Sequence, residues 1–262
     1  MITSSIPNTW SDLQDKVSDI LTQCGFSVET EKTVQTVRGS VELDVYAIET
    51  IKGRKYSIIC ECKYWKSRIP QNVIHAFRSV VGDLGANVGY VISLNGFQKG
   101  AFNVSELTNI ELVTWEEFQT FFFETWYDVY FSKEMASRLN PLLTYSEPIL
   151  PAWFDKMSRE DKEIYYSLKD KYDVLGHIVM NYTHYGRMLG NKPIPLLPVI
   201  NILSQELEDQ EHIARRVPEN ILTETGYLEF LHLVEKFGAV AISEFRVLRD
   251  KYINTDYRDN DE

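Results

Sequence analysis

The sequence has 262 residues, of which 44% are hydrophobic and 25% charged, and its formal net charge is −11 at pH 7. This composition excludes a disordered, collagen-like or low-complexity chain, and no apolar run approaches the roughly 20 residues that span a bilayer. The N-terminus lacks a signal-peptide pattern and three cysteines are too few for a disulfide framework, so we expect a cytoplasmic protein without membrane contact.

Helix and strand patterns alternate over the first half of the chain. Apolar residues at helical spacing predict helices over residues 10–24 and 72–84. Alternating or continuous apolar runs predict strands over residues 26–29, 41–48, 56–63, 88–93 and 110–113. This order predicts an α/β domain with an α-β-β-β-α-β core, in which helices flank a mixed central sheet.

The strand signal fades after residue 114, and the rest of the sequence predicts helices. A dense aromatic run over residues 118–131 predicts a helix whose rings pack in a core. Three prolines between residues 141 and 151 indicate a break between domains. We therefore predict an α/β domain over 1–131, a proline-containing linker over 132–157 and an all-helical domain over 158–262.

Charged side chains lie on the two central predicted strands. Because side chains alternate with period two, Glu42 and Asp44 share one face of the first strand, and Glu61 and Lys63 share one face of the second. A symmetric Lys-Gly turn between the strands would set Asp44 opposite Glu61 and Glu42 opposite Lys63. Directly opposed β-carbons lie about 4.5–5.5 Å apart. Four ionisable groups would then converge on one patch of the sheet.

Such a patch has the chemistry of a metal site for phosphodiester hydrolysis. Carboxylate oxygens suit Mg²⁺, with Mn²⁺ as a substitute, and such a metal can lower the pKa of a bound water. Lys63, two residues beyond Glu61, could orient that water and stabilise charge on the phosphate. The alternative is a cross-strand charge cluster on an exposed sheet face, with no functional role.

The negative net charge argues against a nucleic-acid partner, but the charge is unevenly distributed. Residues 51–80 contain seven basic side chains and one acidic side chain, a local balance of +6. Within this segment Lys66, Arg68 and Arg78 could contact a phosphate backbone without reading base sequence. Equally, they could form a solvated basic edge.

Four segments resemble the PD-(D/E)XK nuclease superfamily and, over residues 10–105, its Mrr-like restriction endonuclease domain. These segments are Gly25-Phe26 after the opening helix, Asp44-Val45-Tyr46-Ala47, Glu61-Cys62-Lys63-Tyr64-Trp65, and the stretch from Ser93 to Ala101 with its Gly96-Phe97 pair. An isolated Asp…Glu-x-Lys pattern would be weak. The Glu-Cys-Lys-x-Trp run with its downstream Gly-Phe turn is more specific.

The resemblance implies a restriction-endonuclease-like fold and a Mg²⁺-dependent endonuclease that hydrolyses DNA, and it suggests a role in restriction or antiviral defence. It implies that Asp44 and Glu61 are metal ligands, that Lys63 is the catalytic lysine, and that Gln98 and Lys99 contact DNA. Many such domains place a glutamate in the opening helix, where this sequence has Gln14. Glu42 could supply the additional carboxylate, so the number of metal ions is open.

Other readings of the sequence stay open. A protein of this fold could be a catalytically weak or inactive nucleic-acid-binding or interaction protein, and RNA is an alternative substrate to DNA. The helical domain contains no chemical motif and could serve oligomerisation, target recognition or regulation. A homodimer would bring two catalytic domains together for double-strand cleavage, so a homo-oligomer is expected.

Overall fold

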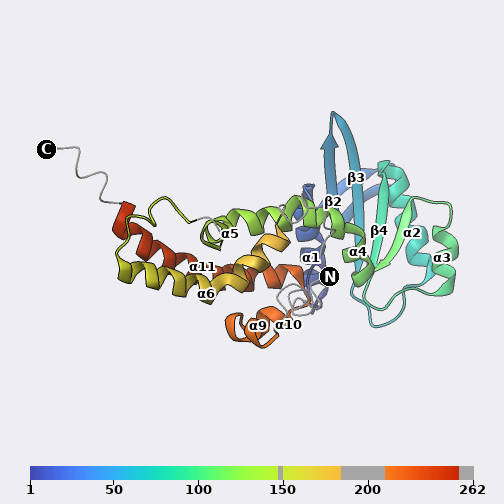
Figure 1. Ribbon diagram of the computed structural model, residues 1–262. Helices are drawn as coiled ribbons and strands as arrows, with labels where there is room; N and C mark the ends of the chain where they lie inside the picture. Colours follow the sequence, from blue (N-terminus) through green and yellow to red (C-terminus); the bar gives the residue numbers. More distant parts are fainter. Residues whose placement is uncertain (147–149, 184–209, 254–262) are drawn as a thin grey trace. The chain divides into compact units, whose positions relative to one another are not determined.

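The computed structural model describes residues 1–146, 150–183 and 210–253. Contacts within the chain divide it into two compact units (Figure 1). We call Met1–Val129 the sheet unit and Tyr130–Glu262 the helical unit. Residues 184–209 and 254–262 of the predicted helical domain lie outside the described part. No helix in the described part is long and apolar enough to cross a membrane.

The sheet unit is built on a mixed five-stranded sheet in which the strands lie side by side in chain order. The first three strands pair antiparallel, and the third to fifth pair parallel. The predicted α/β class with a mixed sheet is confirmed. The strands are β1 (Ser27–Thr36), β2 (Gly39–Ile51), β3 (Arg54–Lys63), β4 (Val88–Ser93) and β5 (Ile110–Thr114).

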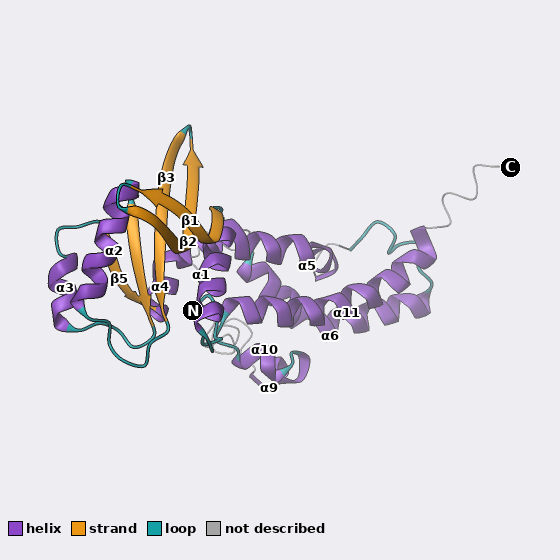
Figure 2. Cartoon of the chain, turned by 180° about the vertical axis from the view of Figure 1, so that it is seen from behind, coloured by secondary structure: helices purple, strands orange, loops and turns teal. Residues whose placement is uncertain are grey.

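Two pairs of helices cover the sheet. Figures 1 and 2 show α1 and α4 against one face, and α2 and α3 against the other. Apolar side chains at helical spacing turn inward from α1 and α2, as predicted. These elements are α1 (Trp10–Gln23), α2 (Gln71–Leu84), α3 (Lys99–Ser105) and α4 (Trp115–Trp126).

The turn between β2 and β3 fixes their register. Lys52 has a φ of 48° and Gly53 a φ of 81°, the two positive values that a tight two-residue hairpin turn requires. The pairs run from Ile51 opposite Arg54 to Val45 opposite Cys60. This is the register predicted from a symmetric Lys-Gly turn.

Strand β1 is longer than the sequence predicted, since it spans Ser27–Thr36 whereas the pattern indicated only residues 26–29. It is an edge strand, exposed or half-buried along its length. An edge strand of this kind needs few apolar residues, so its Ser, Thr, Glu and Lys content hid it from a search for hydrophobic alternation.

The helical unit is a set of packed helices with an aromatic core. A π-helical turn, η1 (Tyr127–Phe131), spans the boundary between the units. Among the buried aromatic side chains, Tyr145 stacks on Phe245 with ring centroids 4.6 Å apart, and Tyr165 meets the same ring edge-on. The described helices are α5 (Ser132–Ser146), α6 (Arg159–Tyr182), α9 (Gln210–Arg216), α10 (Glu219–Thr223) and α11 (Tyr227–Ile253).

The structure differs from the predicted linker over residues 132–157. Most of this segment is helix α5, which contains Pro141 in its interior. A proline there removes one backbone hydrogen bond and normally breaks a helix. Here α5 packs against α6 and α11, and buries Met135, Leu139 and Leu142. This burial offsets the lost bond, and single-sequence propensity cannot reveal it.

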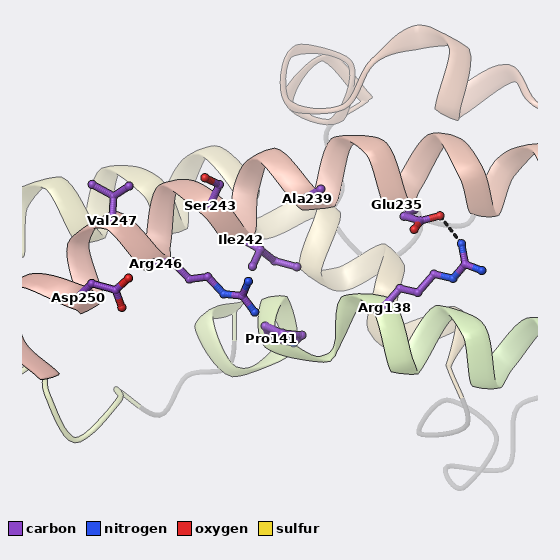
Figure 3. Close-up of a pocket in the computed structure, with 9 residues that line it drawn as sticks. All are labelled: Arg138, Pro141, Glu235, Ala239, Ile242, Ser243, Arg246, Val247 and Asp250. Atoms are coloured by element: carbon purple, nitrogen blue, oxygen red, sulfur yellow. Dashed lines mark hydrogen bonds and ion pairs between the residues drawn. The ribbon is translucent and has the colours of Figure 1, made fainter. Parts of the chain in front are cut away.

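A groove of about 410 Å³ lies in the helical unit between α5 and α11 (Figure 3). Its lining combines apolar side chains with the ion pair between Arg138 and Glu235. None of the residues predicted to form the catalytic site lies in this groove. The candidate site must therefore be sought in the sheet unit.

Candidate active site

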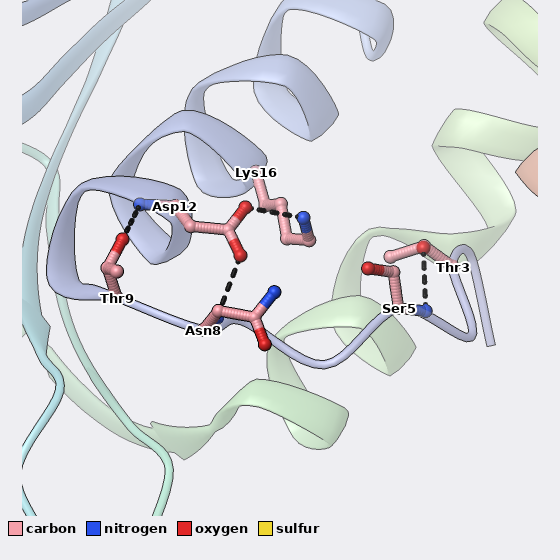
Figure 4. Close-up of polar contacts among 6 residues, drawn as sticks. All are labelled: Thr3, Ser5, Asn8, Thr9, Asp12 and Lys16. Atoms are coloured by element: carbon pink, nitrogen blue, oxygen red, sulfur yellow. Dashed lines mark hydrogen bonds and ion pairs between the residues drawn. The ribbon is translucent and has the colours of Figure 1, made fainter.

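The start of α1 is fixed by a small network of polar contacts (Figure 4). The Thr9 hydroxyl accepts a hydrogen bond from the backbone N–H of Asp12 at 3.0 Å, which caps the helix. The Asp12 carboxylate accepts the backbone N–H of Asn8 at 2.8 Å and pairs with Lys16 at 2.6 Å. Such caps stabilise a helix by about 1 kcal/mol. They also hold the first two turns, from which Trp10 and Gln14 reach the sheet.

Asp44 lies where the pairing of β2 is interrupted on both sides. The recorded pairs with β3 end at Val45, and on the β1 side Glu31 departs from strand geometry with a φ of 50°. The backbone carbonyl of Asp44, at this interruption in the strand pairing, accepts a hydrogen bond from the Gln14 side-chain amide at 2.7 Å. The Asp44 carboxylate accepts the backbone N–H of Cys62 at 2.6 Å. A side chain thus continues the contact between β2 and β3 beyond the last paired residues.

The electrostatics of Asp44 are unusual for a surface carboxylate. Burial, followed by the negative charge of Glu61, raises the pKa of Asp44 to about 6. Hydrogen bonds from the Cys62 backbone and the Trp10 side chain, together with the positive charge of Lys63, act in the opposite direction. Two carboxylates therefore interact across this part of the sheet, although the predicted pairs of Asp44 with Glu61 and of Glu42 with Lys63 lie beyond the last pair between β2 and β3.

Lys63 is held at the end of β3, where its ammonium group forms an ion pair with the Glu61 carboxylate. Both side chains are half-buried. The Lys63 Nζ also lies 5.7 Å from the centre of the Trp65 ring, within the range of a cation–π interaction. Asp44, Glu61 and Lys63, which we call the charged cluster, are therefore linked to one another through electrostatic contacts.

The neighbouring cysteines do not supply a nucleophile. Cys60 and Cys62 point away from the charged cluster and are buried. Burial is the largest cause that raises the pKa of each thiol well above its usual range. Because the thiolate is the reactive form of cysteine, these side chains act as small apolar core residues.

Two loops leave the sheet beside the charged cluster. Strands β3 and β4 are parallel, so the segments after Lys63 and Ser93 leave the same edge of the sheet. The loops are joined by a bridge between Ile69 and Phe97, and by a hydrogen bond from the Asn95 amide to the Trp65 carbonyl at 2.6 Å. This connection fixes the position of both loops next to the site.

The predicted nucleic-acid contacts are exposed. Lys66 and Arg68 lie in the first loop, Gln98 and Lys99 follow the second, and Arg78 lies on α2. None of the four cations forms an ion pair with a residue that the structure describes. The Gln98 amide lies 3.5 Å from the Arg68 carbonyl, so Lys66, Arg68 and Gln98 gather in the two linked loops, and Lys99 begins α3 directly after them.

The additional carboxylate expected near the metal is not found in the cluster. Glu42 is exposed and lies opposite Thr33 of β1, while Gln14 is buried and bonds to the Asp44 backbone. Within the described ranges, no group of three or more His, Cys, Asp or Glu side chains could hold a metal ion. A metal here would rely on two carboxylates, with water completing its coordination.

Sequence reasoning missed one residue that positions the site. Trp10 is the first residue of the predicted helix over residues 10–24, and its indole N–H donates to the Cys62 carbonyl at 3.1 Å and also interacts with the Asp44 carboxylate. One signal could have found it. Trp10 and Gln14 are four residues apart, so they share a helix face, and both reach the same part of the sheet.

One comparison with known proteins bears on the sheet unit. Residues 7–122 match the family model described as restriction endonuclease. No curated protein matches the sequence. A crystal structure titled as a protein of unknown function covers 63% of this chain and 98% of its own, at 15% identity and a TM-score of 0.37. At this identity and TM-score the similarity supports no conclusion about the fold or function of this chain. The matched segment contains the charged cluster and both linked loops, and the match is consistent with an Mrr-like nuclease domain of the PD-(D/E)XK type over residues 7–122.

Proposed function

We propose that this protein is a metal-dependent endonuclease that hydrolyses DNA phosphodiester bonds at the charged cluster. The observation that carries the proposal is the electrostatic coupling of Asp44 and Glu61 across β2 and β3, with Lys63 held beside them. Half-buried charges on central strands cost stability. A catalytic role gives a reason for keeping them.

The residues present fit a hard divalent cation. Asp44 and Glu61 would hold Mg²⁺ or Mn²⁺, because their repulsion is relieved when a cation lies between them. When bound, the metal would polarise a phosphate and lower the pKa of a coordinated water. Trp10 and Gln14 would act as positioning residues, since one bonds to the Cys62 carbonyl and the other to the Asp44 backbone.

Lys63 would act on the phosphate. Hydrolysis adds a water oxygen to phosphorus and breaks one P–O ester bond, and the departing oxygen takes up a proton. An ammonium group beside the reacting phosphate stabilises the negative charge that grows on its oxygens. Four exposed cations would hold the phosphate backbone: Lys66 and Arg68 in the first loop, Lys99 at the start of α3, and Arg78 on α2. Gln98 could donate a hydrogen bond to the same backbone.

The test is cleavage of supercoiled and linear DNA by the full chain with Mg²⁺ or Mn²⁺, with EDTA as the metal-free control. Lys63→Ala should lower the rate by roughly 10²- to 10³-fold, the usual effect of removing a group that stabilises transition-state charge. Lys55→Ala is the matched control, because it removes an equal charge from the far end of the same strand. Cleavage that survives Lys63→Ala, or that persists in EDTA, would contradict the proposal.

A second candidate function is nucleic-acid binding with weak or no catalysis. One observation favours it, since the Glu61 carboxylate already forms an ion pair with Lys63. The resemblance adds a second point, because Gln14 replaces the opening-helix glutamate of many such domains. DNA binding without metal-dependent cleavage would support this candidate over the first.

The wider biological setting rests on the family alone. Restriction or antiviral defence is the role that a restriction endonuclease domain suggests. DNA is the substrate that we favour over RNA, and a homodimer would place two sites for double-strand cleavage. The helical unit would serve oligomerisation, recognition or regulation. Size measurement in solution and cleavage of matched DNA and RNA strands test these points separately.

A further inference from the structure

We propose that Trp65 is a base-stacking platform, and that the site therefore binds unpaired nucleotides in preference to intact duplex. This inference rests on the proposed function, because a base bound at Trp65 bears on catalysis only if the charged cluster cleaves the strand. It concerns the substrate class, which neither the charged cluster nor the family match specifies.

Trp65 is both exposed and fixed. Its side chain is 42% exposed, although tryptophan is usually largely buried. Its carbonyl accepts the Asn95 amide at 2.6 Å, which ties it to the second loop. Its ring lies 5.7 Å from the Lys63 Nζ. A partly exposed aromatic ring thus lies on a backbone that is tied to the second loop, next to the residue that would act on the phosphate.

The surroundings of Trp65 match a nucleic-acid strand in charge. Tyr64, the preceding residue, is also exposed. Lys66 and Arg68 follow within three residues, and neither forms an ion pair with a residue in the described ranges. Cations beside an aromatic face are the usual composition of single-strand binding sites, where the backbone follows the charge and bases stack on the rings.

Stacking requires a base that has left the duplex. Inside a B-form duplex, away from its ends, each base is covered on both faces by its neighbours, so a protein ring can stack there only on an unpaired or flipped base. Trp65 lies two residues from Lys63 on the chain, and a base seated on it would belong to a nucleotide near the scissile bond. The preferred substrate should therefore be a single strand, a flap or a mismatched segment.

The experiment measures the binding of labelled oligonucleotides to the full chain by fluorescence anisotropy, in EDTA so that cleavage cannot occur. The probes are a 12-nucleotide single strand of mixed sequence, the blunt duplex of that strand, and a strand of equal length that carries abasic sites. The variants are Trp65→Ala, Trp65→Phe and Trp65→Leu. Tyr56→Ala is the control, since Tyr56 is 41% exposed and lies at the opposite end of β3.

We expect the wild-type protein to bind the single strand more tightly than the duplex. Trp65→Ala and Trp65→Leu should weaken single-strand binding about tenfold, in the range found for loss of one base–aromatic stack. Trp65→Phe should retain most of the affinity. The abasic strand should bind weakly and should be insensitive to all three variants, while Tyr56→Ala should change no affinity more than twofold.

Several outcomes would overturn the inference: equal affinity for strand and duplex, an equal effect of Trp65→Ala on the abasic strand, or a loss in Trp65→Phe as large as in Trp65→Ala. The cleavage assay separates this result from the proposed function. Duplex cleavage that needs Lys63 but not Trp65 would support the nuclease and contradict base stacking on Trp65. Single-strand preference without any metal-dependent cleavage would support base stacking on Trp65 and contradict the nuclease.

Discussion

The two units of the chain use charge in opposite ways. In the sheet unit, Asp44, Glu61 and Lys63 are half-buried on central strands, and burial together with Glu61 raises the pKa of Asp44 to about 6. In the helical unit, ionisable side chains pair between helices at the surface, as Arg138 does with Glu235 and Lys171 with Glu244. The first arrangement costs stability, whereas the second contributes to it.

This difference shows where function is to be sought. A surface ion pair between helices is explained by packing and solubility alone. A carboxylate held on a central strand, with its pKa raised, has no such explanation and is typical of a functional site. Substitutions in the charged cluster should therefore abolish activity without a matching loss of stability, whereas substitutions in the helical unit should change stability and leave activity unchanged.

The largest expected effect is the loss of cleavage in Asp44→Asn. The amide keeps the size of the side chain and can still accept the Cys62 N–H, but it loses the charge that would hold a metal. Cleavage of supercoiled DNA should fall at least about a hundredfold, because metal-ion catalysis contributes several kcal/mol. Glu42→Gln serves as the comparison on the same strand. An unchanged cleavage rate in Asp44→Asn would show that the Asp44 carboxylate takes no part in catalysis.

The next effect concerns packing in the sheet unit. A Cβ atom added at Gly89 would lie 2.5 Å from the Val81 side chain and 2.8 Å from the Phe77 ring. Because both neighbours are stiff, we expect Gly89→Ala to lower the free energy of unfolding by about 1–3 kcal/mol. Urea denaturation measures this. Gly82→Ala in α2 has open space around the new atom, and should be neutral or stabilising by up to about 1 kcal/mol.

The same substitution in the helical unit offers a direct comparison. A Cβ atom at Gly238 would meet the end of the Leu139 side chain, which can rotate away. Gly238→Ala should thus cost less than Gly89→Ala in the same urea experiment. A larger loss at Gly238 would show that the helical core is the more rigidly packed of the two.

A smaller effect is the pH dependence of stability. The pKa of Asp44 is higher in the folded than in the unfolded protein, so the protonated carboxyl stabilises the fold. This stabilisation is fully present below about pH 4 and is lost as the pH rises through about 6. Without metal, Asp44→Asn should avoid that loss and be the more stable protein at pH 8, by of the order of 1 kcal/mol given partial solvent exposure. Thermal unfolding in EDTA at pH 4 and pH 8 measures the difference, which should shrink at pH 4.

The smallest effect is expected at the surface of the helical unit. Arg138 pairs with Glu134 and Glu235, and its side chain is one-third exposed. Arg138→Ala should lower the free energy of unfolding by about 0.5–1 kcal/mol and leave DNA cleavage unchanged. A loss of cleavage with intact folding would instead give the helical unit a part in activity.

Much of the sheet unit follows from local sequence signals. The register of β2 and β3 was predictable because the Lys52-Gly53 turn demands positive φ at both positions, and because strand side chains alternate strictly. Asp44 was expected directly opposite Glu61, but the pairs between β2 and β3 end at Val45 and Cys60. Its carboxylate takes the Cys62 N–H beyond the last recorded pair, and this leaves no periodic trace in the sequence.

Two other features depend on tertiary contacts that a single sequence does not encode locally. Pro141 continues through helix α5 because neighbouring helices bury that helix. The resemblance placed Gln14 near the site, because many such domains have a glutamate at this position of the opening helix. Its bond to the Asp44 carbonyl exists only because that carbonyl lies where β1 and β2 are not paired.

The most direct test of the central claim is thermal unfolding of wild-type protein and Asp44→Asn at pH 8, each in EDTA and in Mg²⁺. A ligand that binds only the folded state raises its stability, by about 2.7 kcal/mol at a hundredfold excess over Kd. We predict that Asp44→Asn unfolds at the higher temperature in EDTA, and that Mg²⁺ raises the Tm of the wild-type protein alone. An equal Mg²⁺ shift in both proteins, or a less stable Asp44→Asn in EDTA, would contradict a metal site built at the cost of stability.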